Sequence, residues 1–172
     1  MFRSVRIPAL LSLLALSLPA TAEAAPVRAS PIAKSRVTLV KPLTLQRIND
    51  MDFAWLGVTT GGTATIDPIS GALSVSGGLI PLGGTPSPAR YAGAASKSTV
   101  VNIKVPRQAV PITRVGGTET LMVGNFTLDG QDKRTLAQSG SFIFAVGAQI
   151  TVPAGTIDGL YAGEIDVTIQ YP

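Results

Sequence analysis

The sequence contains no cysteine and no histidine. Disulfide bonds, thiol nucleophiles, histidine-containing catalytic triads and the usual zinc sites are therefore all excluded. A domain without disulfides must be stabilised by packing alone. No other pattern in the sequence indicates a metal site or a cofactor, so we expect a protein that is not an enzyme.

Charged residues are also scarce, at 14% of the chain. The 14 basic residues are scattered and are not interleaved with aromatic residues. A nucleic-acid surface needs a stripe of positive charge, which argues against that class of partner. Long amphipathic helices are missing too, because 18 glycines and 13 prolines interrupt the segments where they could form.

The first 24 residues have the three parts of a secretory signal peptide. Arg3 and Arg6 supply a basic start, residues 9–18 are largely apolar, and Ala22-Glu23-Ala24 is a small-x-small cleavage site. The apolar run is short for a bilayer span, although an N-terminal core helix or a membrane anchor is the alternative. We expect cleavage after Ala24, export to the periplasm and then the cell surface, and no membrane segment afterwards.

β-Branched residues recur between the glycines and prolines, which predicts short strands and many turns. About nine strands at this spacing indicate an all-β domain over residues 37–172, as a β-sandwich, with a closed barrel as the alternative. We expect a buried Trp55, a turn at Gly61-Gly62 and a hairpin turn at Asp129-Gly130. The strand at 141–152, which is apolar on both faces, should be either central in a sheet or part of an interface. The predicted strand segments are 37–45, 51–58, 63–66, 72–76, 90–95, 98–105, 118–128, 141–152 and the end of the chain. Within 118–128, Leu121 and Val123 should share one face and Phe126 should lie on the other.

The final stretch has the clearest strand pattern in the sequence. Apolar residues alternate with Asp166, Thr168 and Gln170, as in a strand with one buried and one solvent-exposed face. The sequence offers no further strand for its outer edge, so we expect this edge to pair with another chain. The alternative is a closing strand paired on both sides within the domain. The predicted pairing edge comprises Gly159, Ile165, Val167, Ile169, Tyr171 and Pro172.

Residues 25–36 form a predicted N-terminal arm. Pro26 and Pro31 block regular pairing, so the arm should be extended. It has few large apolar residues for a strand that would insert into another subunit. Either the donor segment extends through residues 37–45, or this subunit accepts a strand better than it donates one. The candidate donor residues are Val27, Ile32, Val37 and Leu39.

Several short motifs occur in an order that resembles the secreted DUF4402 domain family. They are Met51-Asp52-Phe53, residues 62–66, Met122-Val123 with Phe126, Gly140 with Val146-Gly147, residues 161–163 and residues 167–171. The sequence departs from the family pattern at Ala54 and Ala148, where glycine is usual.

Members of this family look like the pilin-type subunits of the chaperone–usher route, including the spore-coat-U type. The resemblance implies an immunoglobulin-like sandwich that lacks its final strand. A periplasmic chaperone, and then the arm of the next subunit, would supply that strand. It also implies copies of itself or related subunits as partners, with an outer-membrane usher. Pilins of this class resemble one another in a penultimate tyrosine and a glycine about fourteen residues from the end, here Tyr171 and Gly159.

Other candidate sites have simpler structural explanations. Asp129 and Asp132 resemble a calcium-loop fragment that lacks its closing glutamate. Asp50 and Asp52 could be paired carboxylates, Trp55 could be a sugar-stacking platform, and residues 125–127 fit a glycosylation acceptor. The alternatives to a filament subunit are a monomeric secreted binding module with a complete sandwich and, third, an envelope hydrolase.

Overall fold

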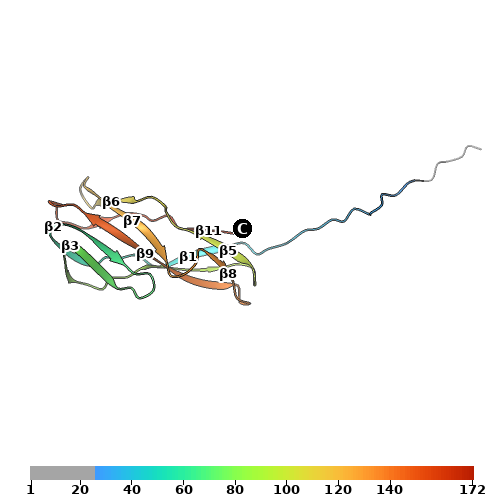
Figure 1. Ribbon diagram of the computed structural model, residues 1–172, viewed down its shortest axis with the longest axis horizontal. Coiled ribbons are helices and arrows are strands. Elements are labelled where there is room, and N and C mark those ends of the chain that lie inside the picture. The colour runs from blue at the N-terminus through green and yellow to red at the C-terminus, as the bar shows by residue number, and fades with distance from the viewer. Residues whose placement is uncertain (1–25) are drawn as a thin grey trace, which may run out of the picture. The chain divides into compact units, whose positions relative to one another are not determined.

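The computed structural model describes residues 26–172, so the predicted signal peptide lies outside the described residues. The chain divides into two compact units after Thr38. Residues 26–38, called the arm from here on, are all exposed and form no strand. Residues 39–172, called the body, contain every strand of the described chain (Figure 1). No helix that could span a membrane occurs between residues 26 and 172.

The body is built of β-strands alone, which confirms the all-β prediction. All of the strand pairs are antiparallel. The strands are β1 (Thr44–Asn49), β2 (Trp55–Ile66), β3 (Leu73–Gly83), β4 (Ala89–Ala94), β5 (Val100–Lys104), β6 (Val110–Arg114), β7 (Thr120–Leu128), β8 (Lys133–Thr135), β9 (Ser141–Val152), β10 (Tyr161–Ala162) and β11 (Thr168–Gln170).

Eight strands form a curled sheet in the order β1-β4-β9-β7-β6-β10, and β2 joins it by pairing with both β9 and β3. The other three strands form a small sheet in the order β11-β5-β8 (Figure 1). Strand β9 is central, which is one of the two positions that its apolar residues on both faces predict. It pairs with β4 along its first half, with β2 near its end and with β7 on its other edge.

The small sheet packs against the β4–β9 part of the curled sheet. Ile103 of β5 belongs to the same buried cluster as Tyr91 of β4 and Phe144 of β9. Phe144 is 0% exposed, and its ring stacks on Tyr91 with the centroids 5.2 Å apart. Aromatic pairs of this kind add to the stabilisation from area burial. A second cluster lies between β2, β3, β7 and the end of β9, around Ala148 and Ile150.

Two glycine pairs, Gly61-Gly62 in β2 and Gly77-Gly78 in β3, lie inside strands. The predicted turn at Gly61-Gly62 is therefore wrong. Strand β2 continues through these residues to Ile66, with a register shift against β3 between Val58 and Gly62. A Cβ atom on Gly62 would lie 2.2 Å from the carbonyl oxygen of Ser76, so only glycine allows the two backbones to approach this closely. The chain reverses later, at a turn in which Asp67 accepts hydrogen bonds from the backbone N–H groups of Ile69 and Ser70.

Three further predictions about the body are wrong. Strand β1 begins at Thr44, whereas residues 37–43 form no strand. The Asp129-Gly130 turn does not make a hairpin, because β8 crosses to the small sheet and pairs with β5. In β7 we expected Phe126 opposite to Leu121 and Val123. A bulge with Asn125 at φ 48° shifts the alternation, and Phe126 packs into the core.

Candidate strand-pairing edge

Strand β11 is an edge strand of the small sheet. It pairs with β5 in the register Thr168 to Lys104, Ile169 to Ile103 and Gln170 to Asn102. Within residues 26–172, no strand pairs with its other edge, and no backbone–backbone hydrogen bond outside the sheets involves residues 163–172. An edge of this kind presents unpaired N–H and C=O groups to an incoming strand.

The predicted alternation is present along this segment. Ile165, Val167, Ile169 and Tyr171 are half-buried, whereas Asp166, Thr168 and Gln170 are exposed. Val167 and Ile169 pack against the cluster around Phe144, and Ile169 and Tyr171 pack against a third cluster formed by Ala95, Val101 and Leu136. The apolar face of the segment therefore covers the core, but incompletely.

Strand β1 also has an edge that no strand of the described chain pairs. Its Leu45 packs against the same cluster as Val167 and Ile169, and Leu43, just before β1, packs against the same cluster as Tyr171. Two strands from different sheets, each with a free edge, thus contribute side chains to one shared part of the core.

The Tyr171 side chain connects the chain segments around this edge. Its hydroxyl donates a hydrogen bond to the carbonyl oxygen of Lys41 at 2.6 Å and accepts one from the backbone N–H of Ser96 at 3.0 Å. The Ser96 hydroxyl in turn accepts a hydrogen bond from the Lys41 N–H at 2.6 Å. The three residues form a closed hydrogen-bond network that fixes the segment before β1 to the end of β11.

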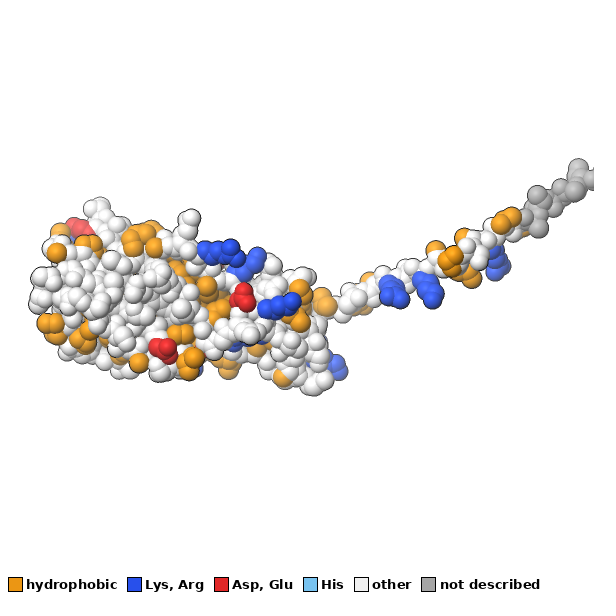
Figure 2. Space-filling view, viewed as in Figure 1, with side chains coloured by type: hydrophobic (Ala, Val, Ile, Leu, Met, Phe, Trp, Pro, Cys, Tyr) orange, Lys and Arg blue, Asp and Glu red, His pale blue; other side chains and the backbone are white. Residues whose placement is uncertain are grey.

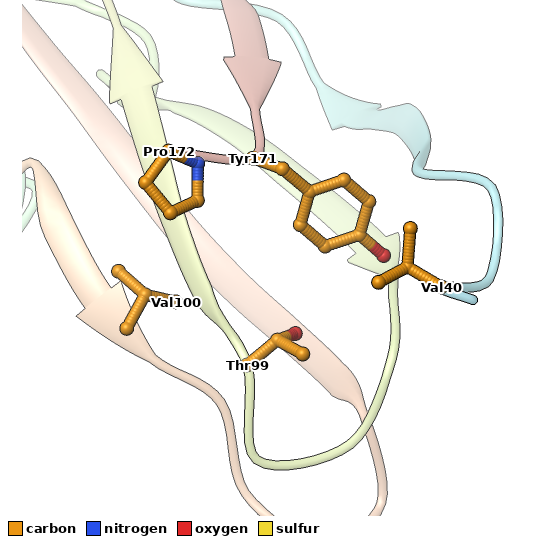
Figure 3. A pocket seen from close by; sticks show the side chains of 5 residues that line it. All are labelled: Val40, Thr99, Val100, Tyr171 and Pro172. Atoms are coloured by element: carbon orange, nitrogen blue, oxygen red, sulfur yellow. The ribbon is translucent and has the colours of Figure 1, made fainter. Parts of the chain in front are cut away.

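An open cavity of about 320 Å³ lies beside this network. Figure 3 shows the rings of Tyr171 and Pro172 facing Val40, Thr99 and Val100 across it. Most of its wall is apolar, and no ionisable side chain other than the Tyr171 phenol lines it. The cavity suits an apolar side chain better than a charged or catalytic group.

The remaining predicted edge and donor residues lie elsewhere. Gly159 is exposed at φ 148°, and a Cβ atom on it would lie 2.9 Å from Cδ of Arg114. The candidate donor residues expose large apolar side chains to solvent. Their exposed fractions are 97% for Val27, 75% for Ile32, 81% for Val37 and 88% for Leu39.

Three of the four other candidate carboxylates, those of Asp50, Asp52 and Asp129, have partners within the body, and the fourth, Asp132, is exposed. Asp50 forms an ion pair with Arg47, and Asp52 accepts a hydrogen bond from the backbone N–H of Ala54. Asp129 pairs with Arg134 at 2.6 Å. No group of three acidic side chains in residues 26–172 is arranged to hold a metal ion.

Trp55 is 73% exposed, so the prediction that it belongs to the core is wrong. On the outer face of β2 and β3 it lies near Gly57, whose missing side chain leaves room for Leu82. Leu82 is 66% exposed and Ile80 is 48% exposed. The alternation in this stretch could have indicated the outward position, because Leu56 and Trp55 cannot share one face of a strand.

The fold and this edge define a class, namely all-β domains of two antiparallel sheets with an apolar edge strand that lacks a partner in the described chain. The model for the domain of unknown function DUF4402 matches residues 43–171. The chain therefore belongs to the DUF4402 family, and the match begins just before β1 and includes β11. No curated protein and no solved structure matches the chain.

Proposed function

We propose that this chain is a structural subunit of a bacterial cell-surface filament, a pilus- or fimbria-like assembly built by β-strand complementation. In this proposal the body is an incomplete immunoglobulin-like sandwich, and a neighbouring subunit completes it at β11. The observation that carries the proposal is the half-buried apolar face of residues 165–171 beside an edge without a partner in the described chain.

Strand addition at this edge would use two kinds of interaction. Backbone hydrogen bonds would satisfy the free groups of β11, and alternating side chains would fix the register. Covering the half-buried side chains would contribute about 25 cal/mol for each Å² of apolar surface removed from water. Neither step needs a catalytic residue, a metal or a cofactor.

The proposed partners follow from the same edge. Copies of this chain or related subunits would fill it in the filament, and a periplasmic chaperone would cover it before assembly at an outer-membrane usher. The resemblance to pilin-type subunits supports this assignment, as does the exposed arm that precedes the body.

The test compares two variants of neighbouring residues in the secreted chain. Ile169→Asp places a charge on the half-buried face, whereas Thr168→Asp places the same charge on the exposed face. We expect concentration-dependent oligomers from the wild type and Thr168→Asp, and none from Ile169→Asp. Size-exclusion chromatography with light scattering measures this, and circular dichroism shows whether Ile169→Asp remains folded. A wild type that is a cooperative monomer at every concentration would refute the proposal.

The exposed Trp55 favours a second candidate function, a monomeric secreted module that binds a sugar or matrix component. The exposed indole at the start of β2, with the exposed Leu82 and Ile80 on the paired strand β3, is suited to stacking or apolar contact. A monomeric wild type whose glycan binding is lost in Trp55→Ala would support this alternative.

A further inference from the structure

The four longest strands of the body, β2, β3, β7 and β9, contain no charged residue. Every lysine, arginine, aspartate and glutamate of the body lies in a loop or in one of the shorter strands. The small sheet, in contrast, exposes Lys104 and Lys133, and Figure 2 shows charged side chains gathered over that sheet and few over β2 and β3. Exposed surfaces of soluble proteins normally carry charges of both signs. The uncharged strands therefore suit a ligand that carries no charge.

The outer side of these four strands is built mainly from short polar side chains. Alternate residues, such as Ala64 and Ile150, belong to the buried cluster, and the residues between them face solvent. The strand registers align the outward residues in two rows, all of them exposed or half-buried. These residues, called the polar face from here on, are Ser76, Thr63, Thr151 and Met122 in one row and Ser74, Thr65, Gln149 and Asn125 in the other.

Hydrogen bonds hold the side chains of the polar face in a fixed arrangement. Asn125 Nδ2 donates to Gln149 Oε1 at 2.8 Å, and Gln149 Nε2 donates to Thr65 Oγ1 at 3.1 Å. In the other row, the hydroxyl oxygens of Thr63 and Ser76 lie 2.7 Å apart. Asn125 takes part because the bulge in β7, where it has φ 48°, interrupts the alternation of that strand. The bulge thus adds an amide to the polar face.

The row through Asn125, Gln149 and Thr65 keeps an acceptor at one end and a donor at the other. Asn125 Oδ1 and the hydroxyl hydrogen of Thr65 have no partner among residues 26–172. Because β7 and β2 flank β9, these two groups lie two strand spacings apart, about 10 Å. Side chains as short as these lose little rotamer freedom when a ligand binds. The row therefore suits an extended ligand whose groups both donate and accept hydrogen bonds.

The carboxylates that border these strands already have partners. Glu119, just before β7, pairs with Arg114 at 2.7 Å, and Asp129, just after it, pairs with Arg134 at 2.6 Å. Asp67, just after β2, accepts hydrogen bonds within its own turn. These three positions offer no unpaired charge to an ionic ligand, whereas a neutral ligand needs none.

We infer that the polar face binds a neutral polysaccharide, whose hydroxyl groups exchange hydrogen bonds with the hydroxyl and amide side chains of the two rows. This inference goes beyond the proposed function and does not depend on it, because the polar face and β11 belong to different sheets. In a filament, repetition of the site would raise avidity without any new contact. The site is also distinct from the Trp55 surface, because Trp55 precedes Thr63 by roughly 25 Å along β2.

Co-sedimentation of the secreted chain with insoluble polysaccharides tests the class of ligand. Amorphous cellulose and insoluble starch are the neutral probes, and carboxymethylated cellulose is the anionic one. We expect a neutral probe to bind the chain equally at about 0.1 M and about 1 M salt, because hydrogen bonds between neutral groups are not screened. Binding to carboxymethylated cellulose alone, or binding that high salt removes, would show attraction by basic residues and overturn the inference. Binding to neither neutral probe would overturn it as well.

Paired substitutions test the location of the site. Thr65→Val with Gln149→Leu removes the polar groups of one row at similar size, and should lower the affinity for the neutral probe about tenfold or more. Thr168→Val with Gln170→Leu makes the same changes on the exposed face of β11. This second pair is the matched control and should bind as the wild type does.

A further pair keeps the test valid if the half-buried Gln149 is needed for folding. Ser76→Ala with Thr151→Val changes only exposed side chains of the other row, and should lower the affinity severalfold. Circular dichroism shows whether each variant is folded. Unchanged affinity in both folded polar-face variants would overturn the inference.

The outcomes separate the inference from both proposed functions. Binding that Trp55→Ala abolishes and the polar-face variants leave unchanged would assign the ligand to the Trp55 surface and overturn the inference. Polar-face variants that change self-association but not polysaccharide binding would also overturn it, since a second copy would then cover this face. Ile169→Asp should still bind the neutral probe. A wild type that is monomeric under all conditions but binds through the polar face would refute the filament and support the inference.

Discussion

Replacing Tyr171 by phenylalanine removes one oxygen atom that makes two hydrogen bonds. The carbonyl oxygen of Lys41 loses its donor, and the N–H of Ser96 loses its acceptor, while the ring can stay in place. A hydrogen bond contributes about 0.5–1.5 kcal/mol net, and water can reach part of this network. We expect Tyr171→Phe to lower the free energy of unfolding by about 1–2 kcal/mol.

Hydrogen exchange at the Ser96 amide measures the effect locally. Because about 1.4 kcal/mol corresponds to a factor of ten, its exchange should become about tenfold faster in Tyr171→Phe, and urea unfolding should shift by the same free energy. Tyr161→Phe is the matched control, since the Tyr161 hydroxyl donates only to the carbonyl oxygen of Ile157. Unchanged Ser96 exchange and unchanged stability in Tyr171→Phe would show that the network does not hold the two segments together.

Three more predictions concern the body. Phe144→Ala should lower the free energy of unfolding in urea by about 3–5 kcal/mol, because the ring is 0% exposed. Trp55→Ala should change it by no more than about 0.5 kcal/mol. Similar losses in the two variants would contradict the assigned core. Ala54→Gly should raise the free energy of unfolding by up to about 1 kcal/mol, because Ala54 has φ 58°, where an L-residue is strained. A less stable variant would argue against that backbone conformation. The hydrogen bond from Arg114 lowers the pKa of Glu119 from 4.5 to about 2, so its stabilising effect is complete above pH 4.5 and is lost as the pH falls towards 2. Acid titration of thermal unfolding should therefore show a shallower loss in Glu119→Gln, and identical curves would mean that the pair is not formed.

Side-chain alternation predicted the features of the fold that depend on one strand at a time. The alternation at residues 165–171 is present, with the odd-numbered side chains half-buried and the even-numbered ones exposed. A strand's faces follow from its period of two, whatever its neighbours are. The prediction holds as long as no bulge interrupts the strand. It is wrong for β7, because the bulge at Asn125 shifts the alternation before Phe126.

Gly61-Gly62 and Trp55 both lie at positions that differ from those predicted. Gly61-Gly62 was assigned to a turn, but these residues allow β2 and β3 to approach within one long hairpin. Trp55 was assigned to the core from its neighbours Phe53 and Leu56, but it begins β2 on the outer face. Glycine occurs both in turns and in closely paired strands, and only the pairing of strands distinguishes these two roles. The outward position of Trp55, in contrast, follows from its alternation with Leu56.

The strand-pairing edge depends on topology in the same way. Alternation in residues 165–171 shows that one face meets the core, but it does not show which strands flank the segment. Strand β8 pairs with β5 and completes the small sheet on the side away from β11. This pairing depends on contacts between residues about 30 positions apart in the sequence. Neither the apolar pattern nor the turn at Asp129-Gly130 contains this information.

Strand β11 is short, so backbone pairing with β5 contributes little to holding the end of the chain in place. Only three residues pair with β5, although the alternating apolar face extends over seven residues, from Ile165 to Tyr171. The segment is thus held by side-chain packing and by the Tyr171 hydrogen bonds more than by backbone pairing. A strand added along this edge would pair with the backbone groups of the segment that point away from β5, in addition to covering the half-buried side chains. Such an edge can gain stability from a partner without first breaking any backbone hydrogen bond of the body.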